Sequence, residues 1–324
     1  MLPIGNLNDW SYIRSGHAHG TVLYAVQSFL TWSFAMFTVT LLTNPAMVLE
    51  APLVNNLRNA FGGSEVQWLA PNGAAEFDLA TRPRNYDQIW NNLQTEGVDM
   101  VIQPTENRRK MMLLADMDST MIQQECIDEL AAEAGVGPHV AKITARAMNG
   151  ELDFEASVRE RVSLLKGLPT SVVADVLKNR ITFVPGGKTL LATMKANGAY
   201  TALVSGGFTS FTQKVAADLG FDENRANTLL FENHKFTGKV AEPILGRDAK
   251  ITALNEIATR LNINAADVLA VGDGANDLGM LGVAGTGVAL HAKPSVQAQC
   301  DIRINHGDLT ALLYLQGYSK AEFV

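Results

Sequence analysis

The stretch that decides the fold is "MMLLADMDSTM", residues 111–121. It opens with an apolar run typical of a strand buried on both faces of a sheet. Two aspartates, Asp116 and Asp118, follow this run with one residue between them. Because side chains alternate along an extended chain, we expect both carboxylates on the same side. Like charges this close raise each other's pKa, so a cation or a reaction should offset the repulsion.

Two later stretches repeat this pattern of an apolar run that ends in a polar turn. "YTALVS" (200–205) leads into a glycine pair, and "DVLAVGD" (267–273) leads into "GANDLGM". Helical patterns separate the apolar runs, at 188–197, 208–219 and 248–261. The alternation predicts a doubly wound α/β core with a parallel sheet. Helix-like sequence at about 123–180 is too long for one crossover, and we expect it to form a helical cap.

A different pattern occupies residues 36–105. Alternating strands are expected at 37–42 and 98–102, and helices at 52–63 and 86–97. Two more strands, around Val66–Trp68 and Phe77–Leu79, flank the turn "PNGA". The order β-α-β-β-α-β predicts a small ferredoxin-like α+β domain. The polar, basic stretch "QPTENRRK" (103–110) should be a solvated junction to the domain at 106–324.

Residues 1–35 have an unsettled status. "TVLYAVQSFLTWSFAMFTVTLL" (21–42) is long enough to span a bilayer, yet it carries several threonines and serines. The small domain is complete without residues 1–35, and Met36 directly precedes its first strand. An upstream extension with Met36 as the natural start is the preferred hypothesis, and a membrane helix is the alternative.

Composition narrows the classes of function. The chain has 324 residues, of which 47% are apolar and 18% charged, in keeping with a substantial globular core. A net charge of −7 argues against nucleic acid as a partner. The two cysteines, Cys126 and Cys300, form neither a zinc spacing nor a disulfide framework, which suits a reducing cytoplasm.

The three polar turns should meet, because ligands of a parallel sheet bind at the carboxyl ends of its strands. They carry Asp116, Asp118, Asp273 and Asp277, and Ser205 before two glycines. Carboxylates beside open backbone N–H groups point to a hard cation bridging to a phosphate, for which Mg²⁺ is well suited.

These residues resemble the haloacid dehalogenase-like phosphatases. Their pattern is D-x-D-x-T, then Ser or Thr, then Lys, then G-D-x-x-x-D, and it is matched in order by Asp116–Thr120, Ser205, Lys250 and Gly272–Asp277. The resemblance implies that Asp116 is the nucleophile, which forms an aspartyl phosphate, and that Asp118 is the acid and base. It implies Mg²⁺ held by Asp116, Asp273 and the backbone carbonyl of Asp118.

The same resemblance assigns the phosphate-binding groups. Ser205, the Gly206 amide and Lys250 would bind the phosphoryl oxygens. Asn276 and Asp277 would position metal-bound water and Lys250. Each residue alone has a plainer reading, such as a turn for Ser205 and a helix cap for Asp277.

The predicted cap resembles that of the phosphoserine phosphatase family in "MIQQECIDELAAEAGV" and in "F-x-x-S-x-x-x-R-V-x-L-L-K". The resemblance implies that Glu125 binds a substrate ammonium and Arg161 a carboxylate, with Met148 and Phe154 shielding the pocket. Spacing alone leaves Arg159 open as an alternative to Arg161, since the two face differently on a helix.

The implied activity is hydrolysis of O-phospho-L-serine, the last step of L-serine biosynthesis, by a cytoplasmic enzyme. Transfer of the phosphoryl group to homoserine or another small alcohol is the alternative, and a regulatory amino-acid-binding protein with an inactive hydrolase domain is a third. The small domain resembles amino-acid-binding regulatory modules by topology only. Its role could be ligand binding, packing against the rest of the chain or formation of a homodimer.

Overall fold

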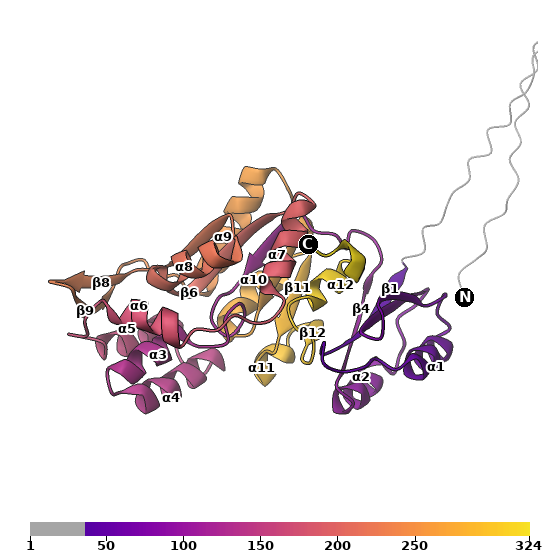
Figure 1. Cartoon of the computed structure of the whole chain (residues 1–324), viewed down its shortest axis with the longest axis horizontal. Coiled ribbons are helices and arrows are strands. Elements are labelled where there is room, and N and C mark those ends of the chain that lie inside the picture. Colours follow the sequence, from indigo (N-terminus) through magenta and orange to yellow (C-terminus); the bar gives the residue numbers. More distant parts are fainter. Residues whose placement is uncertain (1–35) are drawn as a thin grey trace, which may run out of the picture. The chain divides into compact units, whose positions relative to one another are not determined.

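The computed structural model describes residues 36–324 (Figure 1). The expectations for residues 1–35, a membrane helix or an upstream extension, lie outside the described residues. Within residues 36–324, no helix combines the length and apolar character that crossing a membrane requires.

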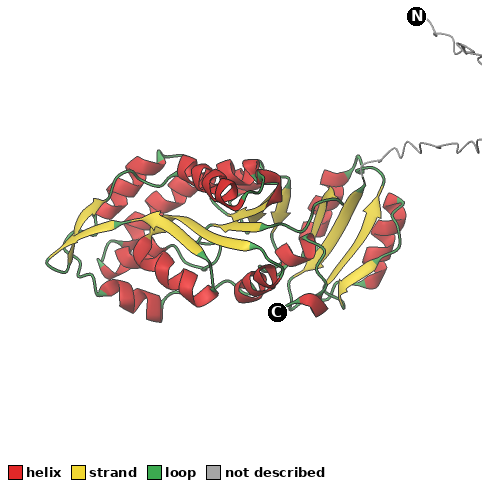
Figure 2. Cartoon of the chain, turned by 90° about the horizontal axis from the view of Figure 1, so that it is seen from above, coloured by secondary structure: helices red, strands yellow, loops and turns green. Residues whose placement is uncertain are grey.

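The first folded part is an antiparallel sheet covered by two helices. Its strands have the order β2-β3-β1-β4, and both helices lie on one face of the sheet (Figure 2). The elements are β1 (Phe37–Thr43), α1 (Ala51–Phe61), β2 (Gln67–Ala70), β3 (Ala74–Leu79), α2 (Tyr86–Thr95) and β4 (Val98–Pro104). Proline in its first turn and the left-handed Gly62 after its last residue define the ends of α1. The expected ferredoxin-like fold is confirmed.

The second part is built on a parallel sheet with the order β12-β11-β10-β5-β6-β7. The strands are β5 (Met112–Ala115), β6 (Tyr200–Phe208), β7 (Glu223–Asn227), β10 (Val268–Gly272), β11 (Thr286–Leu290) and β12 (Ile302–Ile304). Ala115 pairs with Leu203 on one side and Val271 on the other. The carboxyl ends of the three motif-bearing strands therefore lie next to one another.

Alternation along β5 explains how helices cover both faces of the sheet. Leu113 faces the cluster formed with α7 (Gly187–Ala196), α8 (Thr209–Leu219) and α12 (Ala311–Leu315). Leu114 faces the cluster formed with α9 (Arg247–Leu261), α10 (Leu278–Val283) and α11 (Pro294–Gln297). The expected doubly wound core is confirmed.

A helical cap follows β5. It comprises α3 (Cys126–Glu133), α4 (Gly137–Met148), α5 (Phe154–Ser163) and α6 (Val172–Asn179), which lie together in Figure 1. The hairpin of β8 (Leu229–Glu232) and β9 (Lys235–Val240) adjoins the cap, and the Gly167 N–H donates to the Phe236 carbonyl at 2.8 Å. The helical cap is as expected, whereas the hairpin was not anticipated from the sequence.

Two local expectations were wrong. Strand β6 continues through the glycine pair to Phe208 and does not end at Ser205, whereas α8 lies where a helix was expected. The junction is not fully solvated, because Arg108 pairs with Glu76 at 2.7 Å and Lys110 Nζ donates to the Ala266 carbonyl at 2.7 Å. Tertiary contacts with neighbouring elements thus bury side chains that look like a polar linker in the sequence.

Candidate active site

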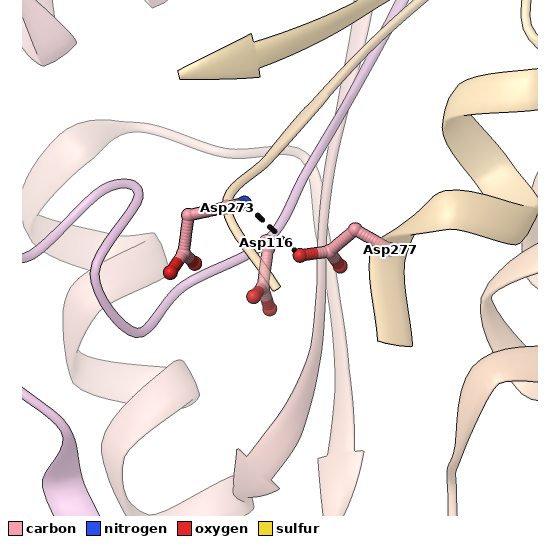
Figure 3. A group of neighbouring side chains, drawn as sticks. All are labelled: Asp116, Asp273 and Asp277. Carbon is pink, nitrogen blue, oxygen red and sulfur yellow. Dashed lines mark hydrogen bonds between the residues drawn. The ribbon is translucent and has the colours of Figure 1, made fainter. Parts of the chain in front are cut away.

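Three aspartates meet at the carboxyl edge of the parallel sheet. Asp116 follows β5, Asp273 follows β10, and Asp277 ends the short 3₁₀ helix η2 (Ala275–Asp277). One carboxylate oxygen of each lies within 4.8 Å of the others (Figure 3). Asp277 Oδ2 accepts the N–H groups of Asp273 at 3.1 Å and Gly274 at 2.9 Å, which fixes the turn between the two aspartates.

Lys250 of α9 is the cation of this cluster. Its Nζ lies 2.6 Å from Oδ1 of Asp116 and 2.6 Å from Oδ1 of Asp277, and all three side chains are buried. Burial by itself lowers the pKa of Lys250, but the charges of Asp116 and Asp277 outweigh it and raise that pKa. The lysine therefore stays charged, as a phosphate-binding or charge-neutralising group must.

The cluster has more negative charge than Lys250 can balance. Burial, followed by the charge of Asp277, raises the pKa of Asp116 well above its usual range. Burial and the charge of Glu125 do the same to the pKa of Asp273. Among the described residues, Asp273 Oδ2 has no hydrogen-bond partner, and Lys293 Nζ lies 3.7 Å from it. Carboxylate oxygens with an unmet need for positive charge fit a hard divalent cation.

Asp118 is held apart from the three other aspartates. Its Oδ1 accepts the Cys126 N–H at 2.8 Å, and its Oδ2 accepts the Ser205 hydroxyl at 3.2 Å. Burial raises the pKa of Asp118, while the hydrogen bonds from Cys126 and Ser205 act in the opposite direction. A side chain at Gly207 would place its Cβ 2.5 Å from Asp118 Oδ2, which explains why the strand has glycine there.

Glu125 precedes α3 and points into the same region. It accepts the Ser119 hydroxyl at 2.7 Å, and Ser119 is itself in the left-handed region with φ 55°. Burial and the charge of Asp118 raise the pKa of Glu125 to about 7. An acid in this environment gains most from a positively charged partner.

The structure separates the two arginines that sequence spacing left open. Arg159 lies at the surface and pairs with Glu155 and Glu242, each at 3.0 Å. Arg161 is 3% exposed, and it lines a pocket together with Asp116 and Asp118. The helix periodicity of α5 turns one arginine outward and the other inward.

The pocket gathers the remaining candidate substrate-binding residues. Its lining includes Asp116, Asp118, Glu125, Met148, Phe154, Arg161, Ser205, Gly206 and Asn276. A Cβ at Gly206 would lie 2.6 Å from Phe154 Cζ, so the cap and the sheet are in close contact there. Every residue proposed from the sequence for the substrate or the reaction thus lines this pocket or, like Lys250, contacts Asp116.

Sequence reasoning missed several contributors. The Cys126 N–H holds the carboxylate of Asp118, and the Thr120 hydroxyl donates to Asp273 Oδ1 at 3.3 Å. Lys293 follows β11, so the strand-end rule that located the aspartates could have found it. Thr144 contacts Arg161 across two helices, and no local pattern indicates such a contact.

The fold and the site define the class of protein. The sequence profile of the haloacid dehalogenase-like hydrolases matches residues 113–282, and the chain belongs to this family. This range contains the aspartate cluster, Lys250 and the cap.

Individual relatives narrow the class. A probable phosphoserine phosphatase of Schizosaccharomyces pombe is 46% identical over 232 residues, which cover 70% of this chain and 78% of the relative. A haloacid dehalogenase family hydrolase from Salmonella enterica serovar Typhi is similar in structure with a TM-score of 0.76 and 32% identity, over 86% of this chain and 98% of the other.

A third similarity concerns a reaction intermediate. A phosphoserine phosphatase solved as a phospho-aspartyl intermediate analogue matches with a TM-score of 0.61 and 44% identity, over 64% of this chain and 98% of the other. The chain is therefore a hydrolase whose named relatives act on a phosphoric monoester.

Proposed function

We propose that this protein hydrolyses O-phospho-L-serine to L-serine and phosphate, the last step of L-serine biosynthesis, in the cytoplasm. The observation that carries the proposal is the convergence of Glu125 and Arg161 on the pocket that contains Asp116 and Asp118. Phosphoserine has a phosphate, an ammonium and a carboxylate. The aspartate and Lys250 end of the pocket suits the first, Glu125 the second and the Arg161 fork the third.

The first step is transfer of the phosphoryl group to Asp116. A carboxylate oxygen of Asp116 attacks phosphorus, and the bond between phosphorus and the serine oxygen breaks. Asp118 gives its proton to the departing serine oxygen, so that L-serine leaves as a neutral alcohol. The raised pKa of Asp118 favours the protonated state that this step needs.

The second step returns Asp116 to its starting state. Asp118, now ionised, accepts a proton from a water molecule as the water oxygen attacks phosphorus. The bond between phosphorus and the Asp116 oxygen breaks, and phosphate leaves with the new oxygen. Positioned acid and base help of this kind contributes roughly 10²–10⁴-fold to a rate.

Mg²⁺ is the divalent cation we propose for the cluster. Asp116, Asp273 and the backbone carbonyl of Asp118 would hold it, and Asp277 would support the site through Lys250 and the turn at Asp273. When bound, the ion would neutralise charge between the carboxylates and the phosphate. Ser205, the Gly206 amide and Lys250 would donate to the phosphoryl oxygens, and Asn276 would orient water near the cluster.

A substrate panel tests the proposal. Phosphate release is measured from phosphoserine, phosphothreonine, phosphotyrosine and phosphoethanolamine, with Mg²⁺ and with EDTA. Phosphoserine should have the highest kcat/KM, and EDTA should abolish turnover. A higher kcat/KM on another ester would overturn the substrate assignment. Accumulation of phosphohomoserine when homoserine is added would favour the phosphotransferase alternative.

Two variants test the roles of the paired aspartates. Asp116→Asn should abolish the phosphoenzyme that radiolabelled substrate leaves on the wild-type chain after an acid quench and that hydroxylamine releases. Asp118→Asn should still bind phosphate but turn over at least about a hundredfold more slowly. An Asp118→Asn enzyme at full rate would remove Asp118 from the reaction.

A further inference from the structure

A chain of hydrogen bonds crosses three helices of the cap. The Thr144 hydroxyl of α4 donates to Oδ1 of Asp128 in α3 at 2.6 Å. Nη1 of Arg161 in α5 donates to the same hydroxyl at 3.0 Å. Thr144 and Arg161 are each 3% exposed, so the bond between them is shielded from bulk water, whereas Asp128 is partly exposed.

The chemistry of the three groups fixes the direction of the chain. A hydroxyl has one proton to donate, and a guanidinium can only donate. The Thr144 proton therefore points to Asp128, and a lone pair of its oxygen faces Arg161. A carboxylate that accepts the proton polarises the hydroxyl and makes it a better acceptor.

A second contact completes the anchoring of Arg161. Its Nε donates to the Ser157 carbonyl at 3.1 Å, one turn earlier on α5. Contacts at Nε and Nη1 define the plane of the guanidinium. Within the described part of the chain, Nη2 makes no protein hydrogen bond, and Arg161 borders the pocket.

The hydroxyl also separates two opposite charges. Among the described residues, Arg161 forms no ion pair with a carboxylate, although Asp128 lies on the far side of Thr144. A carboxylate bound directly to the fork would compete with a carboxylate of the substrate. With Thr144 between them, Asp128 orients the fork through the hydroxyl, and among the described residues Nη2 keeps its donors for a substrate carboxylate.

From this geometry, and resting on the proposed function, we infer that Thr144 and Asp128 are positioning residues that orient Arg161 toward the substrate carboxylate. They make the enzyme select phosphate esters that carry a carboxylate. Their contribution belongs to substrate binding and leaves the reacting phosphorus untouched.

The test compares Thr144→Val, which keeps the shape and loses the hydroxyl, with Thr144→Ser, which keeps the hydroxyl. Substrates are phosphoserine and phosphoethanolamine, which lacks the carboxylate. Thr144→Val should raise KM for phosphoserine about tenfold, which is one lost hydrogen bond, and leave kcat within about twofold. KM for phosphoethanolamine should not change, and Thr144→Ser should behave as wild type.

A second pair of variants tests the same inference in case the Thr144→Val protein does not fold. Asp128→Ala frees the hydroxyl to rotate and should raise KM for phosphoserine alone, whereas Glu129→Ala, its neighbour paired with Arg180, should change neither KM. Equal KM changes for both substrates, or an unchanged KM for phosphoserine, would overturn the inference. Failure of the proposed function would appear instead in the wild-type enzyme, as no preference for phosphoserine over phosphoethanolamine.

Discussion

Lys250 and Asp277 form a buried ion pair, with Nζ 2.6 Å from Oδ1, and the same nitrogen lies 2.6 Å from Oδ1 of Asp116. One lysine thus connects the proposed nucleophile to the residue that holds the turn after β10. Asp277 also accepts two backbone N–H groups of that turn. The position of Asp116 relative to Asp273 therefore depends on Lys250.

Replacement of Lys250 by methionine keeps the length of the side chain and removes its charge. We expect kcat for phosphate release to fall by at least about a hundredfold, because a charge that stabilises the transferring group is lost. Arg247→Met, an exposed cation one turn earlier on α9, is the matched control and should keep full activity. A Lys250→Met enzyme within tenfold of wild type, in kcat measured at saturating substrate, would contradict the role.

Lys293 should weaken metal binding. Its Nζ lies 3.7 Å from Asp273 Oδ2, so it competes with a cation for that oxygen. Lys293→Gln should lower the Kd for Mg²⁺ by about two- to fivefold, a small effect because the lysine is partly exposed. Calorimetric titration of the substrate-free protein measures this directly. Lys188→Gln, on another helix, serves as control; a Kd that rises in Lys293→Gln would show that the lysine assists binding.

The acid Glu125 should make substrate binding depend on pH. With a pKa of about 7, it is mostly ionised at pH 8 and mostly neutral at pH 6. The neutral form attracts an ammonium less, so KM for phosphoserine should rise by up to about tenfold as pH falls from 8 to 6. Glu125→Gln should have a high KM at both pH values. The same pH dependence in Glu125→Gln would assign the effect to another group.

Asp99 should stabilise the contact between β4 and the loop after β12. Its buried carboxylate accepts the N–H groups of Asn305 at 2.9 Å, His306 at 2.9 Å and Gly307 at 2.8 Å. Asp99→Asn replaces one carboxylate oxygen by an NH₂ group, which faces a backbone N–H and cannot accept its hydrogen bond. The free energy of unfolding, measured by urea titration, should fall by about 2–3 kcal/mol. The exposed Asp87→Asn is the control. Equal stability of the two variants would show that the three bonds contribute little.

Sequence reasoning located the strand-end residues of the site because strand ends obey a simple rule, whereas Lys250, Glu125 and Arg161 came from the family resemblance. Asp116, Ser205 and Asp273 follow apolar strands, and parallel strands bring their carboxyl ends to one edge. The ferredoxin-like order of the small domain followed equally from periodicity. The glycine pair after Ser205 predicts a turn at the end of the strand, whereas β6 continues through the glycines to Phe208.

Contacts between distant segments could not be read in the same way. Periodicity alone cannot choose Arg161 over Arg159, because the choice depends on which face of α5 lies toward α4 and the pocket. The hydrogen bond that Arg161 donates to Thr144 joins residues 17 positions apart. The backbone N–H groups that donate to Asp99 lie more than 200 positions from it. Their sequence neighbourhoods look like ordinary helix and strand surfaces.

The sequence by itself determined the two folds, the cap and the edge of the sheet where the aspartates meet, because short-range periodicity and strand-end motifs are local properties of the chain. Tertiary structure alone decided how the carboxylates divide between one cluster around Lys250 and the separate Asp118. It also decided what orients Arg161, the arginine that the family resemblance implied and that spacing by itself did not distinguish from Arg159. These outcomes depend on how helices and strands pack against one another. Local sequence patterns do not predict them, because the side chains in contact belong to segments far apart in the chain.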